Sequence, residues 1–348
     1  MNKERTNIII MGTLATGSSA LVDMLTEYDN INVLPYEFND FRKPGFVSDQ
    51  LSYDSSLNYP NVIDNEIQFV NFRWKLIYKS KVWKLLSETM LDIIWEKEFK
   101  NKKLKAYKNS LIELFHADFL TELNKSLKSD IPYSNKIKLA NNWINRIGSI
   151  YPYHYDFTLF NQPLHPWSDV NIWTKVFNPF KLIIVYRDPK DQLAEMVRRE
   201  IIFSPFRNSQ LSYGQFNIIS IYGNDRKGRM QFLTDALTKR VEKIDKWLDV
   251  LRPDQVLFVD FEGLINHYEV YKAKIEQFLG VSSERHKYKM KYYNPDKAKQ
   301  RCIGIYENYL TEQEIKDLAS LEMWYNSKVK HVNFEQIDKS QIVKPEAF

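Results

Sequence analysis

Gly12-Thr13-Leu14-Ala15-Thr16-Gly17-Ser18-Ser19 directly follows the apolar run Asn7-Ile8-Ile9-Ile10-Met11 in this chain of 348 residues. The apolar run predicts a buried strand, and the stretch framed by two glycines predicts a tight turn with a helix beginning near Ser18. A strand, a turn and a helix in this order point backbone N–H groups and the positive end of the helix at one spot. We therefore expect a phosphate or sulfate group to bind at this turn.

The spacing G-x-x-x-x-G-S-S resembles the P-loop of nucleoside triphosphatases, but Ser18 stands where those enzymes carry a lysine. A P-loop kinase is one alternative, since Val256–Asp260 is similar to a strand that ends in a magnesium-binding aspartate. The missing lysine argues against it, because that residue bridges the terminal phosphates of the nucleotide. The turn thus favours an anion other than MgATP.

Composition indicates a globular protein with a mild positive charge. The net charge is +5, from 49 basic and 44 acidic residues, which suits an anionic small ligand better than nucleic acid. The single Cys302 excludes an internal disulfide and a four-cysteine zinc site, and it fits a reducing compartment. No apolar segment is long enough to span a bilayer, and the first residues do not form a signal peptide. We expect a soluble, cytoplasmic protein without a bound metal.

The chain alternates between strand and helix patterns. Apolar runs predict strands at residues 7–11, 31–34, 137–140, 157–160, 181–186 and 255–259. Helical patterns lie near residues 141–149, 189–201, 229–251 and 268–279. This alternation implies a central parallel sheet with helices on both faces, a three-layer α/β/α domain over residues 1–348. Residues 65–130 also have helical periodicity and are expected to form an insertion on that domain.

A second motif follows the strand predicted at residues 181–186. There Arg187 is followed by Asp188-Pro189, which opens a helix with proline at a position that helices tolerate. An arginine at the carboxyl end of a central strand lies where open α/β sheets bind ligands, and its guanidinium suits a phosphate. The alternative is a structural ion pair of Arg187 with Asp188 or Asp191.

Together, these motifs resemble the sulfotransferase family, whose members use 3′-phosphoadenosine 5′-phosphosulfate (PAPS), and in particular the bacterial carbohydrate sulfotransferases. The family has a first-strand loop of the type G-x-P-R/K-S-G-T-T and, much later, a strand followed by R-[ND]-P-x-D, here Gly12–Ser19 and Arg187–Asp191. Residues 255–264 and 275–280 are similar to a third element of the family, a strand with a Y/F-E-x-L turn and an F-L-G helix end. Residues 299–310 resemble the loop that closes over the nucleotide. The resemblance covers residues 7–40 and 155–326 and implies the P-loop-like sulfotransferase fold.

The resemblance also implies roles for individual residues. The loop from Gly12 through Ala15, Thr16, Gly17, Ser18 and Ser19 would hold the 5′-phosphosulfate of PAPS. Arg187 would hold the 3′-phosphate, with Glu195 at the position of a phosphate-binding serine. Lys299, Arg301, Ile303 and Gly304 would add donors from the closing loop at about residues 295–310. The reaction would transfer a sulfuryl group to a hydroxyl of a saccharide or related acceptor, without a metal.

A base must remove the proton of the acceptor hydroxyl. Glu37 follows the second predicted strand, at the place where some carbohydrate-modifying members carry a glutamate base. His154 is the alternative base, and His165 a further one. Each of the three could also be an ordinary surface or packing residue.

The chain departs from the family at three positions, where Ala15 and Asn161 replace basic residues and Glu195 replaces a serine. The basic residues available to compensate are Arg42, Lys43, Lys175, Arg198 and Arg199. Arg198 and Arg199 lie three and four residues after Glu195, where either would neutralise it on one helical face. A protein that binds a nucleotide as a scaffold, without catalysis, is the second alternative.

Overall fold

The computed structural model describes residues 5–12, 14–38, 41–42, 47–51, 117–126, 131–148, 155–166, 168–200, 221–223 and 225–330. Its sheet consists of β1 (Thr6–Gly12), β2 (Ile31–Glu37), β3 (Phe157–Asn161), β4 (Phe180–Tyr186) and β5 (Val256–Asp260). The strand order is β2-β3-β1-β4-β5, and every neighbouring pair is parallel. All five carboxyl ends therefore meet at one edge, where ligands bind in open α/β sheets.

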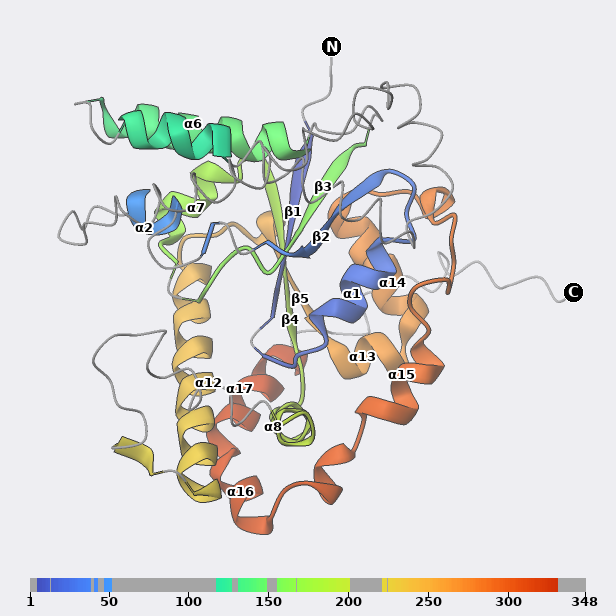
Figure 1. The fold of residues 1–348 in the computed structure, drawn as a ribbon. Coiled ribbons are helices and arrows are strands. Elements are labelled where there is room, and N and C mark those ends of the chain that lie inside the picture. Colours follow the sequence, from blue (N-terminus) through green and yellow to red (C-terminus); the bar gives the residue numbers. More distant parts are fainter. Residues whose placement is uncertain are drawn as a thin grey trace, which may run out of the picture.

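Helices cover both faces of this sheet (Figure 1). One face packs against residues 117–126, α6 (Tyr133–Gly148), α7 (Val170–Val176) and the end of α12 (Arg226–Leu248). The other packs against α1 (Ser18–Leu25), α13 (Phe261–Asn266) and α14 (Tyr268–Leu279). Alternation along β1 explains the two cores, because Ile9 and Met11 point to the first and Ile8 and Ile10 to the second. The predicted three-layer α/β/α architecture is confirmed.

A third apolar cluster lies beyond the sheet edge. It joins α8 (Pro189–Arg198), the first half of α12 and α17 (Ala319–Lys330), with Met196, Leu237 and Leu321 among its buried members. The remaining elements are α2 (Val47–Leu51), α15 (Pro295–Cys302), α16 (Glu312–Asp317) and three short 3₁₀ helices, η3 (Pro253–Gln255), η4 (Ser283–Arg285) and η5 (Ile305–Asn308). In the described part of the chain, no helix is long and apolar enough to cross a membrane.

The strand predicted at residues 137–140 is wrong, because these residues belong to helix α6. Ile137, Ala140, Trp143, Ile144 and Ile147 are its buried residues, and their spacing of three and four is the helical period. A short apolar run at the start of such a pattern is ambiguous when it is judged alone. Of the insertion expected at about residues 65–130, the segment 117–126 is helical, and residues 65–116 lie outside the described residues.

Candidate functional site

The turn after β1 has the backbone of an anion-binding loop. Leu14, Ala15 and Gly17 have φ angles of +53°, +46° and +83°, in the left-handed region. A Cβ atom at Gly17 would lie 2.3 Å from the ring of Phe261, so the turn requires glycine there. No side chain of the described residues caps the amino end of α1. The N–H groups and positive dipole of that helix end are therefore not satisfied by a side-chain cap and suit an anion.

Gln162, at the end of β3, holds both ends of the turn. Its Oε1 accepts a hydrogen bond from the Gly12 N–H at 3.3 Å, and its Nε2 donates to Ser18 Oγ at 2.8 Å. The buried hydroxyl of Thr16 makes no hydrogen bond within the described residues. Gln162 thus fixes the turn from a neighbouring strand. The Thr16 hydroxyl, which belongs to the turn itself, has no hydrogen-bond partner among the described residues.

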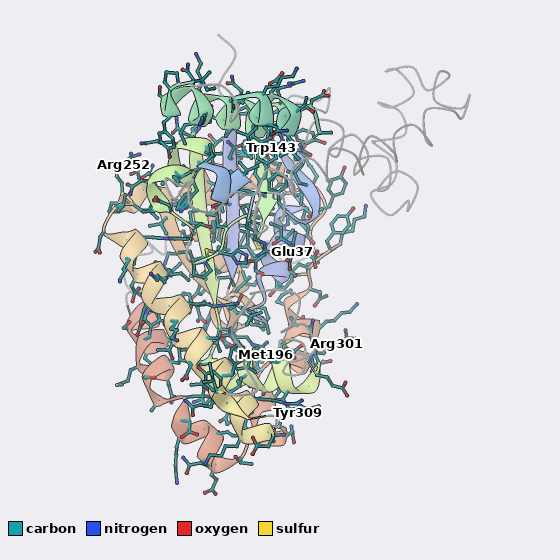
Figure 2. All side chains as sticks on the ribbon, turned by 60° about the vertical axis from the view of Figure 1, so that its left-hand side comes forward. Glu37, Trp143, Met196, Arg252, Arg301 and Tyr309 are labelled. Atoms are coloured by element: carbon teal, nitrogen blue, oxygen red, sulfur yellow. The ribbon has the colours of Figure 1, made fainter. Side chains whose placement is uncertain are left out.

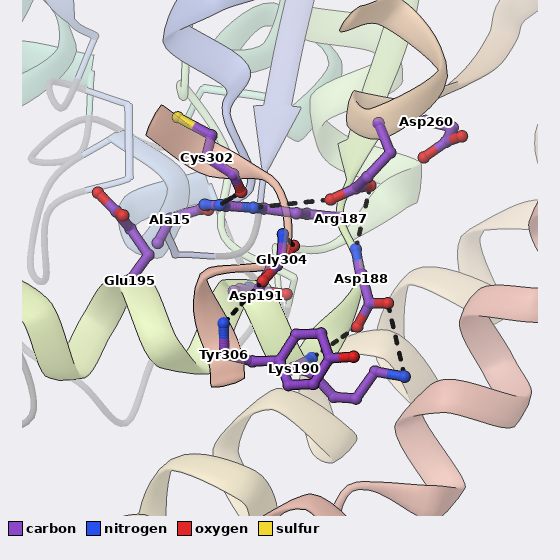
Figure 3. A network of polar contacts seen from close by, with 12 residues as sticks. Ala15, Arg187, Asp188, Lys190, Asp191, Glu195, Asp260, Cys302, Gly304 and Tyr306 are labelled. Carbon is purple, nitrogen blue, oxygen red and sulfur yellow. Dashed lines mark hydrogen bonds and ion pairs between the residues drawn. The ribbon is translucent and has the colours of Figure 1, made fainter. Parts of the chain in front are cut away.

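Arg187 joins three segments beneath the turn (Figure 3). Its Nη1 donates to the carbonyl of Ala15 at 3.1 Å, and its Nη2 donates to the carbonyl of Cys302. On the other side, its Nε lies 3.7 Å from Glu262 Oε1. The two strongest motifs of the sequence, the glycine turn and the arginine after β4, therefore meet in space. The structural ion pair expected with Asp188 or Asp191 is replaced by one with Glu262.

Asp191 anchors the segment between α15 and η5 (Figure 3). Its carboxylate accepts hydrogen bonds from the N–H groups of Gly304 at 2.7 Å and Tyr306 at 3.1 Å. The segment predicted to be a loop near residues 295–310 consists largely of α15 and η5. Because Arg187 and Asp191 both hold it, this segment is attached to the β4–α8 corner by main-chain contacts.

The buried carboxylate of Glu195 is neutralised on its own helix. Its Oε2 lies 2.6 Å from Arg198 Nη2, and its Oε1 accepts a hydrogen bond from Arg199 Nε. These contacts hold the pKa of Glu195 below its usual value, against the effect of burial. The i+3 and i+4 pairing anticipated from the sequence is present, and the acidic side chain at this position does not leave the pocket negative.

A cleft of about 890 Å³ runs along the carboxyl edge of the sheet. It is lined by the turn from Leu14 to Ala20 and by side chains from distant elements, including Glu37 and Arg301 (Figure 2). Among the described residues, its charged lining consists of eight basic side chains, Arg42, Arg187, Arg198, Arg199, Arg240, Lys291, Lys297 and Arg301, and three acidic ones, Asp23, Glu37 and Glu195. The lining is strongly positive, as a polyanionic ligand requires.

The basic residues of α15 that line the cleft differ in part from the ones predicted. Lys297 and Arg301, four residues apart, line it, whereas Lys299 lies between them in sequence and is exposed outside the lining. Ile303 and Gly304 are also not part of the lining. The helical period of α15 explains why Lys297, in place of Lys299, lines the cleft beside Arg301.

Glu37 lies at the β2 end of the cleft and is exposed. Its Oε2 lies 2.5 Å from Nη2 of Arg42, a basic residue considered from sequence as a compensating charge. His165 lines the same cleft, and burial together with the charges of Arg42 and Arg240 lowers its pKa to about 4. His154 and Lys43 lie outside the described residues, and Lys175 is exposed on α7 away from the cleft.

One wall of the cleft is organised by a single buried carboxylate. Glu27, fully buried just after α1, accepts hydrogen bonds from the N–H groups of Met290, Tyr292 and Tyr293 at 3.0, 2.8 and 3.0 Å. His286 Nε2 lies 2.7 Å from the same carboxylate. None of these residues was predictable as part of a site, because Glu27 and residues 286–293 are more than 250 positions apart and match no motif.

Asp260, the residue that the kinase alternative assigns to magnesium, is buried and is engaged by the protein. Its Oδ2 accepts a hydrogen bond from the Gly263 N–H at 2.9 Å and caps α13, and its Oδ1 accepts one from the Tyr325 hydroxyl at 2.8 Å. Among the described residues, no three His, Cys, Asp or Glu side chains are grouped as a metal site.

Comparisons with known proteins give structural similarity only. No protein-family model matches the chain, and no curated protein matches it. The sulfotransferase domain of the Synechococcus PCC 7002 olefin synthase is similar over 93% of this chain and 95% of that chain, with 15% identity and a TM-score of 0.42. Sulfotransferase STF9 from Mycobacterium avium is similar over 91% and 76%, with 12% identity and a TM-score of 0.41. The sulfotransferase domain of the curacin biosynthetic pathway is similar over 91% and 97%, with 13% identity and a TM-score of 0.40.

Proposed function

We propose that this protein transfers a sulfuryl group from PAPS to a hydroxyl group of a saccharide or related acceptor. The observation that carries the proposal is the meeting of Arg187 with the carbonyl of Ala15 in one positively lined cleft. An uncapped helix end and a buried guanidinium at one place suit a ligand that carries two separate anionic groups. PAPS has this character, with a phosphosulfate at its 5′ end and a phosphate at its 3′ position.

The residues of the cleft fit such a donor. The turn of Gly12, Ala15, Thr16, Gly17, Ser18 and Ser19 would hold the phosphosulfate, with the unpaired Thr16 hydroxyl as one donor. Arg187 would hold the 3′-phosphate, with Lys297 and Arg301 adding charge from α15. We assign Lys297 the role first expected of Lys299, because Lys297 lines the cleft. The Gly304 N–H already binds Asp191, so Ile303 and Gly304 would act by positioning α15.

In the proposed reaction, the acceptor oxygen forms a bond to sulfur as the bond from sulfur to the bridging phosphate oxygen breaks. The acceptor proton passes to Glu37, and adenosine 3′,5′-bisphosphate leaves with the electron pair of the broken bond. Such a transfer depends on positioning and on stabilising developing negative charge. The Arg198 and Arg199 side chains replace the basic residue missing at Ala15, since both line the cleft.

The kinase alternative is less favourable. Asp260 already caps a helix and binds Tyr325, and Ser18 stands in place of the P-loop lysine. A scaffold that binds nucleotide without catalysis would keep the turn and Arg187 but would not transfer sulfate.

Thermal stability with two ligands tests the proposal. Adenosine 3′,5′-bisphosphate at about 100 times its Kd should raise the unfolding free energy by about 2.7 kcal/mol, whereas MgATP should have little effect. Incubation with PAPS labelled in its sulfate then separates an enzyme from a scaffold. Stabilisation by MgATP alone, or by neither ligand, would overturn the proposal.

A further inference from the structure

Arg187 faces a carboxyl group with which it does not form a hydrogen bond. Its Nε lies 3.7 Å from Glu262 Oε1, which is beyond hydrogen-bond distance. Both atoms are buried, and neither has a hydrogen-bond partner within the part of the chain that the structure describes. Two opposite charges at such a place normally close to a short hydrogen bond, because a charge-assisted contact is strong. The gap therefore indicates that Glu262 is neutral, since a guanidinium is always charged.

The hydroxyl group of Tyr325 gives a second indication that Glu262 carries a proton. The hydroxyl oxygen lies 2.8 Å from Asp260 Oδ1 and 3.1 Å from Glu262 Oε2. It has one hydrogen and donates it to only one of these two oxygens. If Glu262 is protonated, its O–H donates to the Tyr325 oxygen, and the Tyr325 O–H donates to the nearer Asp260. If both carboxyl groups are ionised, one of the two contacts has no hydrogen in it.

Asp260 is the member of this carboxyl pair that takes the negative charge. Its Oδ2 accepts a hydrogen bond from the N–H of Gly263 at 2.9 Å and one from the Tyr271 hydroxyl at 3.4 Å. Glu262 Oε2 accepts one main-chain hydrogen bond, from the N–H of Asp188 at 3.2 Å. Hydrogen bonds to the ionised form favour it, so Asp260 is the better anion. Burial and the neighbouring Asp260 raise the pKa of Glu262 to about 8.

The other titratable groups around Glu262 are engaged elsewhere or neutral. On α8, the Asp188 carboxylate faces Lys190 Nζ at 3.7 Å, and Lys190 Nζ also lies 2.7 Å from Glu322 of α17. On α15, Cys302 reaches Arg187 through its carbonyl, and burial raises the pKa of its thiol. Burial also raises the pKa of the three surrounding tyrosines, Tyr186, Tyr271 and Tyr325. The charge next to Arg187 therefore depends on Asp260 and Glu262.

We propose that Glu262 is a positioning residue of the donor site, and that its carboxyl group must hold a proton for Arg187 to bind a phosphate of the donor. This inference rests on the proposed function and adds a residue to it. With Glu262 neutral, the charges of Arg187 and Asp260 cancel. With Glu262 ionised, the three side chains have a net negative charge, which repels a phosphate and shares the guanidinium with a second carboxylate.

Phosphate binding and proton binding are then coupled, and the coupling is reciprocal. If the proton on Glu262 strengthens phosphate binding, a bound phosphate strengthens proton binding by the same factor. Where the free protein has an ionised Glu262, the donor should therefore bind with uptake of one proton from solvent onto that carboxylate. The affinity should be constant while Glu262 stays protonated, and it should fall as the pH rises through the pKa of about 8.

Calorimetry with adenosine 3′,5′-bisphosphate between pH 7.5 and pH 9.5 tests the coupling. The Kd should rise about tenfold over this range, the size of a typical coupling between two sites. At pH 9, the heat of binding should vary with the ionisation enthalpy of the buffer in the direction of proton uptake. The ligand contributes little, because a phosphate whose second pKa is about 6 is fully ionised in this range. A Kd that does not change, or binding without proton uptake, would overturn the proposal.

Three variants assign the proton to one residue. Glu262→Gln has no proton to exchange, so the proton uptake at pH 9 should disappear, whereas a purely structural role would change the Kd equally at every pH. Glu284→Gln, at an exposed position, is the matched control and should retain the uptake. Cys302→Ser removes the thiol beside Arg187 and should also retain it. Uptake that persists in Glu262→Gln, or is lost in Cys302→Ser, would refute the assignment to Glu262.

Failure of the proposed function can be distinguished from failure of this inference. The infrared spectrum of the protein alone, minus that of Glu262→Gln, should contain the C=O band of a protonated carboxyl group at pH 7 and lose it at pH 9.5. Absence of that band at pH 7 overturns the inference, whatever the protein binds. If the band is present but the bisphosphate does not bind, the donor assignment fails. The pH series is then repeated with inorganic sulfate, and pH-independent binding of sulfate would overturn the coupling.

Discussion

Arg187 Nη1 lies 3.1 Å from the carbonyl oxygen of Ala15, although the two residues are 172 positions apart. This contact places the end of β4 directly beneath the turn that follows β1. Arg187 is buried and also reaches Cys302 and Glu262. The guanidinium therefore holds the proposed donor site in one shape before a ligand arrives, which would lower the cost of ordering that site on binding.

Replacement of Arg187 should damage both binding and stability. Arg187→Ala should raise the Kd for adenosine 3′,5′-bisphosphate at least about tenfold, through loss of a charged ligand contact. It should lower the unfolding free energy by about 1–3 kcal/mol, because it leaves the carbonyls of Ala15 and Cys302 without their guanidinium donor. Calorimetry and urea unfolding measure the two effects. Arg187→Lys keeps the charge and should lose mainly affinity, and an unchanged Kd in both variants would remove Arg187 from the donor site.

Alanine substitutions at two glycines separate the effect of backbone strain from the effect of a steric collision. Gly17 and Gly280 both have positive φ, at +83° and +70°, but only a Cβ at Gly17 would collide, with the Phe261 ring. Gly280→Ala should lower the unfolding free energy by about 1–2 kcal/mol through the left-handed backbone alone. Gly17→Ala should lower it further and abolish binding of the bisphosphate, whereas Gly280→Ala should not change binding. Equal effects of the two substitutions would show that the turn tolerates a side chain.

Glu37→Gln should separate binding from chemistry. Among the described residues, the exposed carboxylate is paired with Arg42, so the Kd for the bisphosphate should not change. Transfer of labelled sulfate should fall by about 10²–10⁴-fold, the usual contribution of a general base. Unchanged turnover in this variant would exclude Glu37 as the base.

The unfolding free energy should depend on pH through the protonation of Glu262. Burial and the neighbouring Asp260 raise the pKa of Glu262 to about 8, although Arg187 opposes the shift. The folded state therefore retains a proton that the unfolded chain loses above about pH 4.5, and the unfolding free energy should fall as the pH rises from 4.5 to 8.

Glu262→Gln removes this contribution. The unfolding free energy of the variant, relative to that of the unmodified protein, should therefore increase as the pH rises from 4.5 to 8. Urea unfolding at pH 5, 6, 7 and 8 measures the trend. Glu284→Gln, at an exposed position, is the control. Parallel curves for Glu262→Gln and the unmodified protein would contradict the prediction.

The sequence was sufficient to predict the layers of this fold and the meeting of the turn with Arg187 at one edge of the sheet. Strands with two buried faces appear as apolar runs, which is why 181–186 and 157–160 were located correctly. Residues 137–140 were misassigned because a four-residue run hides the longer helical period of α6. The turn and Arg187 were identifiable because both directly follow strands, and all carboxyl ends of a parallel sheet share one edge.

The residues at the periphery of the candidate site could not be predicted from the sequence. Arg240 lies in the middle of a 23-residue helix whose pattern gives no indication of which polar residue faces a cleft. Lys297 was missed because the segment was expected to be a loop, in which the four-residue spacing to Arg301 has no meaning. Gln162 directly follows a predicted strand, and that position was a usable signal for it.

The Glu27 carboxylate ties the main chain of residues 290–293 to the end of α1. Helix α1, which begins at the turn after β1, and the segment that carries Tyr292 and Tyr293 are consequently joined through one buried carboxylate. Under the proposed function, attempts to change the acceptor should leave Glu27 and its partners intact and vary Arg42 and Arg240, which line the cleft from other elements.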